Sequence, residues 1–178
     1  MPEALVTGAS SGIGAAFARR LARDGYDLIL VGRDASRLSV ADPDVKPAVL
    51  VADLATDDGI AAVAERATGV DLLVNNAGFG GYREFCDVDS QVVADLVSVH
   101  VMAVSRLARA AIPAMIARGS GAIINVASLL AFSGTLPPRP LPCRAVYAGA
   151  KAYQVAFTQA LAGELAGTGY GSRSAARA

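Results

Sequence analysis

The sequence is poor in cysteine and in charge. Its only cysteines are Cys86 and Cys143, which lack the spacing of metal ligands, so reduced thiols and no metal site are expected. Charged residues make up 18% of the 178 residues, and 16 basic and 16 acidic side chains give a formal net charge of zero. This balance argues against a nucleic-acid or membrane-surface partner.

The sequence also lacks a recognisable secretory leader. Met1, Pro2 and Glu3 provide no basic segment, and the apolar run that follows is too short, so we expect a cytoplasmic protein. Polar residues, glycine and proline interrupt the longest uncharged stretch, 119–138, which therefore predicts a buried strand and a loop rather than a membrane span. Apolar residues are abundant, at 53%, and predict one compact domain.

Apolar runs of strand length alternate with helical segments, which predicts an α/β fold with a parallel sheet covered by helices. The expected strands are 4–7, 27–32, 48–52, 71–75 and 122–127. The expected helices are 12–24, 57–67, 90–118 and 145–167. The strands are almost continuously apolar, which predicts burial on both faces. The proline-rich segment 136–142 is expected to be a loop.

The first expected strand passes into a helix through the glycine-rich turn TGASSGIG, residues 7–14. Gly8 permits a tight turn, Gly12 lets a phosphate approach the backbone, and Gly14 allows close packing of helix on strand. Free N–H groups at the helix start would face a pyrophosphate. A turn without a ligand is the alternative. The expected dinucleotide-binding residues here are Gly8, Ser10, Ser11, Gly12, Ile13 and Gly14.

The end of the second expected strand bears on the choice of nicotinamide cofactor. In dinucleotide-binding folds an acidic residue there binds the ribose, whereas an arginine accommodates a 2′-phosphate. Gly32 stands in the acidic position, and Arg33 offers a charge-assisted contact. These residues favour NADP(H). NAD(H) stays possible because Asp34 follows directly, and the alternative for Arg33 is a solvated surface arginine.

Tyr147 and Lys151 lie four residues apart and share one face of the helix expected over 145–167. The chain has 14 arginines but only two lysines, Lys46 and Lys151, so a lysine at this spacing is unlike ordinary surface charge. A nearby ammonium favours the phenolate form of a tyrosine. We therefore expect Tyr147 to exchange a proton with an alcohol or carbonyl oxygen.

These motifs resemble the short-chain dehydrogenase/reductase family over about residues 4–168. The TGxxxGxG turn, the NNAG motif at 75–78 and the YxxxK motif at 147–151 occur in the family's order. The resemblance implies a Rossmann-type doubly wound sheet with strand order 3-2-1-4-5. It also implies hydride transfer between NADP(H) and a small-molecule secondary alcohol or ketone. A non-catalytic dinucleotide-binding protein or an inactive fragment is the alternative.

The resemblance also implies roles for further residues. Ser128 follows the fifth expected strand and would hydrogen-bond the reacting oxygen, while Lys151 would also hold the nicotinamide ribose. Asp53 and Leu54 would lie near the adenine. The NNAG motif would support the sheet and line the nicotinamide side of the site through Asn75, Ala77 and Gly78.

Two features depart from the family pattern. His100 stands where the family usually has an asparagine that relays protons to the lysine. An imidazole can relay a proton, but a lone histidine in an apolar helix is also often simply packed and hydrogen-bonded, and both readings stay open. The interval between Ser128 and Tyr147 is long for the family. Ser133 is nearer to Tyr147 but is displaced from the strand end, so Ser128 is preferred.

The last ten residues, 169–178, form an aberrant tail without a strand pattern after a domain over 1–168. A DNA sequence that encodes Val-Arg-Val-Gln-Val-Gly-Cys-Pro-Gly in one reading frame encodes Tyr-Gly-Ser-Arg-Ser-Ala-Ala-Arg when it is read one base later. The first of these peptides looks like the family's sixth strand and Pro-Gly turn. We therefore expect a frameshifted or misread end, with a naturally short member as the alternative. The chain would then associate nonspecifically and show little activity, whereas a frame-restored chain would form a homo-oligomer through helices 90–118 and 145–167.

Overall fold

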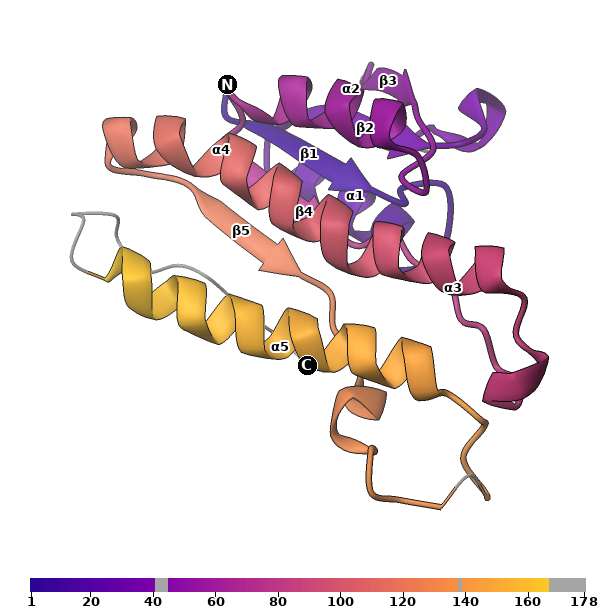
Figure 1. Ribbon diagram of the computed structural model, residues 1–178. Helices are drawn as coiled ribbons and strands as arrows, with labels where there is room; N and C mark the ends of the chain where they lie inside the picture. The colour runs from indigo at the N-terminus through magenta and orange to yellow at the C-terminus, as the bar shows by residue number, and fades with distance from the viewer. Residues whose placement is uncertain (41–44, 138, 167–178) are drawn as a thin grey trace.

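The computed structural model describes residues 1–40, 45–137 and 139–166, in which strands and helices alternate as predicted (Figure 1). The strands are β1 (Glu3–Thr7), β2 (Asp27–Gly32), β3 (Ala48–Val51), β4 (Leu72–Asn75) and β5 (Ala122–Asn125). The main helices are α1 (Gly12–Arg23), α2 (Asp57–Ala67), α3 (Ser90–Val97), α4 (Val104–Arg118) and α5 (Ala145–Leu165). The expectations for residue 167 and for the tail at 169–178 lie outside the described residues.

The five strands form one parallel sheet in the order β3-β2-β1-β4-β5, which confirms the predicted topology. Leu5 of β1 pairs in register with Ile29 of β2 on one side and with Leu73 of β4 on the other. Leu73 in turn pairs with Ile123 of β5. Because all strands point the same way, the segments that follow β1, β2, β4 and β5 gather at the carboxyl edge of the sheet.

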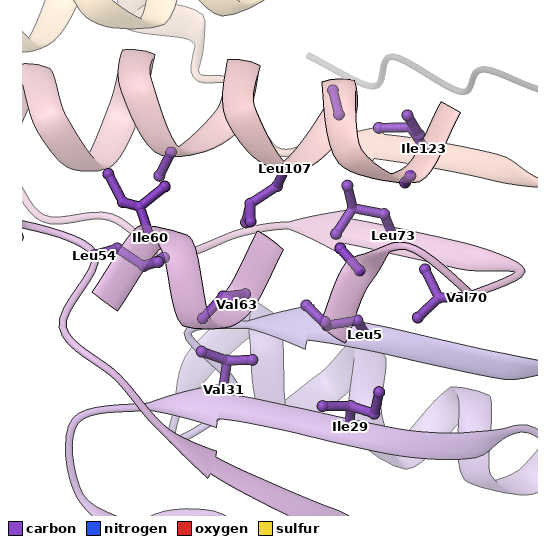
Figure 2. Packing of buried hydrophobic residues seen from close by; sticks show 14 of the residues in the cluster. Leu5, Ile29, Val31, Leu54, Ile60, Val63, Val70, Leu73, Leu107 and Ile123 are labelled. Atoms are coloured by element: carbon purple, nitrogen blue, oxygen red, sulfur yellow. The ribbon is translucent and has the colours of Figure 1, made fainter. Parts of the chain in front are cut away.

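Both faces of the sheet are covered, because side chains alternate between the faces along each strand. One face carries Leu5 and Leu73, which pack with Leu107 of α4 and with α2 residues such as Ile60 (Figure 2). The other face carries Val6, Leu30 and Val74 and packs against Ala18 and Leu21 of α1. Each fully buried leucine or isoleucine contributes about 1.5–3 kcal/mol to folding. The sheet is therefore doubly wound, as the sequence predicts.

The prediction that all strands are buried on both faces is wrong for β3. Val49 and Val51 are 44% and 54% exposed, although Leu50 between them packs against the cluster that includes α2. Helix α1 packs on β1 and β2, so it leaves the Val49 and Val51 face of the edge strand open. An apolar run in the sequence indicates a strand, but whether each face of that strand is buried depends on how far the neighbouring helices extend over the sheet.

The helix expected over 90–118 is continuous but not uniform. A π-helical segment, η3 (Ser98–Ala103), separates α3 from α4, and such segments often occur at functional sites. The whole stretch is long and apolar enough to cross a membrane by length and composition. Here, however, Leu107, Ala111 and Met115 are fully buried against the sheet, so one side of this stretch forms part of the core.

Candidate active site

The turn after β1 is held against the end of β4 by Asn76. The Asn76 side-chain amide donates to the backbone oxygens of Thr7 (3.0 Å) and Gly8 (3.2 Å). The Thr7 hydroxyl accepts from the backbone N–H groups of Asn76 (2.9 Å) and Ala77 (3.0 Å). Asn75, the first asparagine of the NNAG motif, was expected at the site, but Asn76, the second, was not. The role of Asn76 depends on the ends of β1 and β4, which only the folded sheet brings together.

Two glycines of this turn have steric reasons to be glycine. Gly8 has φ +66°, and a Cβ there would lie 2.8 Å from the Ala77 Cα. A Cβ on Gly14 would collide with the Gly8 carbonyl oxygen. The backbone of α1 can therefore approach β1 closely only because neither position carries a side chain, in agreement with the predicted tight turn and close packing.

The first turn of α1 is open to a ligand. Ser11, the N-cap residue, makes no capping hydrogen bond with its side chain, and Ser11, Gly12 and Ile13 are exposed while Ser10 is partly buried. N–H groups in the first turn of a helix have no partner within the helix, and together with the helix dipole they favour an anion. The geometry fits the pyrophosphate of a dinucleotide.

Arg33 follows the end of β2 and is exposed, and it forms no ion pair with any residue that the structure describes. Asp34 is turned away into its own loop. Its carboxylate accepts from the Ser36 hydroxyl (2.6 Å) and the Ser36 backbone N–H (2.9 Å). These bonds from Ser36 lower the pKa of Asp34. The guanidinium is thus available to a phosphate while the neighbouring carboxylate is engaged elsewhere.

The residues after β3 divide between solvent and core. Asp53 is exposed, and its carboxylate accepts from the backbone N–H of Ala55 at 3.0 Å. Leu54 is buried, and its carbonyl oxygen accepts from the Ser98 hydroxyl at 3.1 Å. This bond ties the loop after β3 to the start of η3, so Leu54 helps to position the segment that carries His100.

Asn75 belongs to a buried hydrogen-bonded series that joins the sheet to α5. Its amide donates to the Asn125 side-chain oxygen (2.8 Å), and the Asn125 amide donates to the Thr158 hydroxyl (2.8 Å). Thr158 donates onward to the Gln154 carbonyl oxygen (2.6 Å). Asn75 is 3% exposed. Its side chain therefore supports the sheet, while Ala77 and Gly78 lie nearer the surface.

Tyr147, Lys151 and His100 come together at the carboxyl edge of the sheet. The Lys151 Nζ lies over the Tyr147 ring, 5.8 Å from its centroid. The His100 ring meets Tyr147 edge to face at 5.4 Å, and the Tyr82 ring does so at 5.6 Å. Burial and the adjacent Tyr147 phenol raise the pKa of Tyr82. The helical spacing thus correctly predicts one shared face for Tyr147 and Lys151, whereas the Tyr82 contact carries no sequence signal.

Lys151 is buried, with 4% of its surface exposed. Its Nζ donates to the Val126 carbonyl oxygen (2.7 Å) and to the Gln154 Oε1 (2.9 Å). No carboxylate among the described residues forms an ion pair with it. Burial lowers the pKa of Lys151 to about 8. At neutral pH the amine is therefore mostly charged, and neutral oxygen dipoles stabilise that charge.

His100 is fully buried in η3. Its Nε2 lies 2.9 Å from the Phe79 carbonyl oxygen and 3.3 Å from the Phe79 N–H, while Nδ1 has no partner among the described residues. Burial and, secondarily, the charge of Lys151 lower the pKa of His100 to about 4, so the ring is neutral. A side chain at Gly78 would collide with the imidazole. The histidine is packed and hydrogen-bonded, and a relay role stays a prediction.

Ser128 and Ser133 differ in what their hydroxyls already bind. Ser128 begins the short helix η4 (Leu129–Phe132), which packs against α5, and its Oγ accepts from the Leu130 N–H at 3.2 Å. The Ser133 hydroxyl is buried, donates to the Leu130 carbonyl oxygen (2.7 Å) and accepts from Arg144 (2.6 Å). Within the described chain the Ser128 hydroxyl proton has no acceptor, so Ser128 is the serine that can donate to a substrate.

Arg144 holds the proline-rich loop against the start of α5. This buried guanidinium donates to the carbonyl oxygens of Ser133 (2.7 Å), Leu136 (3.1 Å) and Pro142 (2.9 Å). Beside it lies a mostly apolar cavity of about 680 Å³, whose lining includes Phe85 and Leu136. Sequence reasoning missed Arg144, because a buried arginine cannot be distinguished from a surface arginine by its position in the chain.

The doubly wound sheet, the glycine turn and the polar cluster at the carboxyl edge define a dinucleotide-binding α/β protein of the Rossmann type. The family model for short chain dehydrogenases matches residues 2–170. The chain therefore belongs to the short-chain dehydrogenase/reductase family and is an oxidoreductase of that family.

Individual relatives support this assignment. The chain is 36% identical over 172 residues to an uncharacterized oxidoreductase of Staphylococcus epidermidis, covering 93% of this chain and 72% of that protein. A galactitol 2-dehydrogenase (L-tagatose-forming) of Cereibacter sphaeroides is 37% identical over 93% of this chain and 66% of its own length. Several relatives are thus longer than this chain.

Solved structures share the fold. The bulky-bulky ketone specific alcohol dehydrogenase from Comamonas testosteroni has a TM-score of 0.86 at 34% identity, covering 94% of this chain and 69% of that one. A short-chain dehydrogenase from Sphingobium yanoikuyae in complex with NADPH has a TM-score of 0.86 at 35% identity, covering 95% of this chain and 68% of that one.

Proposed function

We propose that this protein catalyses hydride transfer between NADP(H) and a secondary alcohol or ketone. The observation that carries the proposal is the buried Lys151 amine, which lies over the Tyr147 ring and bonds the Val126 carbonyl oxygen two residues before Ser128, a serine with an uncommitted hydroxyl proton. A positive charge beside a phenol makes loss of the phenolic proton easier. The pair therefore suits a reaction in which an alkoxide or carbonyl oxygen exchanges a proton.

Each residue has a distinct role in this proposal. In ketone reduction, Tyr147 gives its proton to the carbonyl oxygen as that oxygen gains charge, and in alcohol oxidation it takes the proton back. Ser128 donates a hydrogen bond that orients the same oxygen. Lys151 stabilises the phenolate and holds the nicotinamide ribose. When bound, the nicotinamide supplies or accepts the hydride at the carbon of the substrate.

NADP(H) is proposed over NAD(H) because Arg33 is exposed and unpaired within the described chain, whereas the Asp34 carboxylate is engaged with Ser36. An arginine at this place pairs well with a 2′-phosphate. Three structural neighbours, at 33–35% identity, are described as complexes with NADPH or NADP, which supports the proposal. NAD(H) is the alternative cofactor.

The test measures binding and turnover separately. NADPH and NADH are titrated into the chain by nucleotide fluorescence, and ketone reduction is followed with a panel of small and bulky ketones. Both the 178-residue chain and the frame-restored chain are assayed, because the sequence predicts that the tail limits activity. Binding of NADPH with reduction of at least one ketone is expected. Absence of NADPH binding in both chains overturns the proposal, and binding without any turnover favours a non-catalytic dinucleotide-binding protein.

A further inference from the structure

A glutamine fills the space between Lys151 and the helix that carries His100. Gln154 lies three residues after Lys151 on α5 and is 1% exposed. Its Oε1 accepts from the Lys151 Nζ at 2.9 Å, and its Nε2 donates to the His100 carbonyl oxygen at 2.9 Å. Both ends of the carboxamide are thus used, and they connect the lysine to η3.

The direction of the carboxamide is determined by its partners. A carbonyl oxygen only accepts, so His100 requires the NH₂ group of Gln154, and this leaves Oε1 for the lysine, whose ammonium only donates. Burying an amide is unfavourable unless its hydrogen bonds are made, and here both are made. The arrangement therefore presents an acceptor, and not a donor, to the Lys151 amine.

We propose that Gln154 is a positioning residue for Lys151, holding the lysine amine beside Tyr147 by a hydrogen bond anchored on the His100 backbone. The inference rests on the function proposed for Tyr147 and Lys151. A lysine ammonium is a mobile point charge on a flexible stem with three donors. Val126 and Gln154 take two of these donors, which leaves the third for the phenolic oxygen or the cofactor ribose.

The surroundings of Lys151 leave few other ways to stabilise its charge. Tyr147 faces it from α5, and His100 faces it from η3 as a neutral ring, because burial lowers the pKa of that histidine to about 4. Among the described residues, Tyr82 contacts this cluster at the Tyr147 ring. No ion pair to Lys151 exists in the described part of the chain. Two oxygen acceptors therefore provide the direct stabilisation, and loss of either should disfavour the charged amine.

The chain's two lysines allow a direct measurement. Protein labelled with ¹³C-lysine gives side-chain NMR signals from Lys46, which is exposed, and Lys151, which is buried. Titration reports the pKa of each lysine without any need for enzymatic activity. Lys46 serves as the internal reference in every sample.

Two substitutions at Gln154 have opposite expected effects. Gln154→Met keeps the length of the side chain but removes the acceptor, so the pKa of Lys151 should fall below that of the wild type. Gln154→Glu keeps the shape and adds a negative charge, so the pKa of Lys151 should rise. Because the glutamate variant preserves the volume of the side chain, the test does not depend on the folding of the methionine variant.

Thr158→Val is the matched control. It removes a buried hydroxyl that donates to the Gln154 backbone oxygen, but this hydroxyl does not contact Lys151. The Thr158→Val protein should be less stable than the wild type, while the pKa of Lys151 stays at the wild-type value. An unchanged Lys151 titration in both Gln154 variants, or an equal shift in Thr158→Val, overturns the inference.

Turnover is measured on the same samples to separate the two proposals. The pH–rate profile of Gln154→Met should shift in the direction of its Lys151 titration, with kcat lowered several-fold and KM changed little. An active wild type whose profile does not move in Gln154→Met overturns the positioning role alone. If neither the 178-residue chain nor the frame-restored chain binds NADPH or reduces a ketone, the proposed function is contradicted, and the positioning role is contradicted with it.

Discussion

The imidazole of His100 meets the ring of Tyr147 edge to face, with centroids 5.4 Å apart and planes at 87°. This contact joins the π-helical segment to α5 about one helical turn before Lys151. The histidine is neutral and has one ring nitrogen without a partner among the described residues. A change at His100 is therefore expected to affect both the packing of Tyr147 and the dependence of stability on pH.

The buried histidine should make the protein sensitive to acid. The pKa of His100 is lowered from 6.5 to about 4 in the folded chain, so between these values the unfolded state binds a proton that the folded state does not. Stability is then fully present above pH 6.5 and is lost as the pH falls toward 4, with about 1 to 1.5 kcal/mol lost by pH 5.5.

His100→Gln, which cannot titrate, tests this expectation. Urea unfolding of both proteins at pH 7.5 and pH 5.5 should show a larger loss for the wild type than for the variant by about that amount. Carboxylates titrate in both proteins, so their effect cancels in the comparison. Equal losses would show that His100 does not titrate in this window.

Arg33→Ala should weaken NADPH binding by about tenfold or more, because a charge-assisted bond to the 2′-phosphate contributes about 1.5–3 kcal/mol. NADH binding should change little. Arg23→Ala removes an exposed arginine from the other end of α1 and serves as the control. An equal loss for the two nucleotides, measured by fluorescence titration, would contradict the assignment of Arg33.

Tyr147→Phe should lower kcat by about 10²- to 10⁴-fold, the usual contribution of general acid–base catalysis, while the Kd for NADPH stays near that of the wild type. Tyr153→Phe is a matched control on the same helix, where the hydroxyl bonds only Ser105 among the described residues. The measurement is made in the chain that shows turnover. Wild-type rates in Tyr147→Phe would exclude it as the acid–base residue.

Gly14→Ala should destabilise the fold by about 1–3 kcal/mol and weaken NADPH binding, because the new methyl group collides with the Gly8 carbonyl oxygen and pushes α1 from the turn. Gly163→Ala is the control, since it lies in α5 with no atom near its Cβ position. It should instead stabilise the protein by about 0.5–1 kcal/mol. Destabilisation of similar size in both variants would contradict the steric explanation.

Short-range patterns predicted most of the fold. The apolar runs located all five strands to within one or two residues, and the glycine turn and the Tyr147–Lys151 spacing located two parts of the candidate site. The covering of β3 and the π-helical segment around His100 were not predicted. The exposure of β3 and the π-helical geometry both depend on which elements pack against these segments. The periodicity of a segment's own sequence carries no information about those neighbouring elements.

The residues that sequence reasoning did not single out are polar groups whose hydrogen bonds connect different parts of the fold. Asn76 bonds to the end of β1, Gln154 joins Lys151 to the His100 backbone, and Arg144 closes the loop that begins at Ser133. Asn76 belongs to the NNAG motif but was given no role of its own, and Gln154 and Arg144 are ordinary polar residues in the sequence. Helical spacing makes Lys151 and Gln154 neighbours, but only strand register and helix packing bring Asn76 to Thr7 and Gln154 to the His100 backbone within 3.0 Å, and spacing along the chain does not report these contacts.

By itself the sequence determined the α/β alternation, the glycine-rich turn and the shared helical face of Tyr147 and Lys151, because backbone sterics and helical periodicity act between residues close in the chain. The tertiary structure alone decided that Lys151 is buried without a carboxylate partner in the described chain, and that Ser133 is bound to Arg144 while Ser128 is not. These outcomes depend on desolvation and hydrogen-bond geometry between α5, β5 and η3, which exist only once the sheet is assembled.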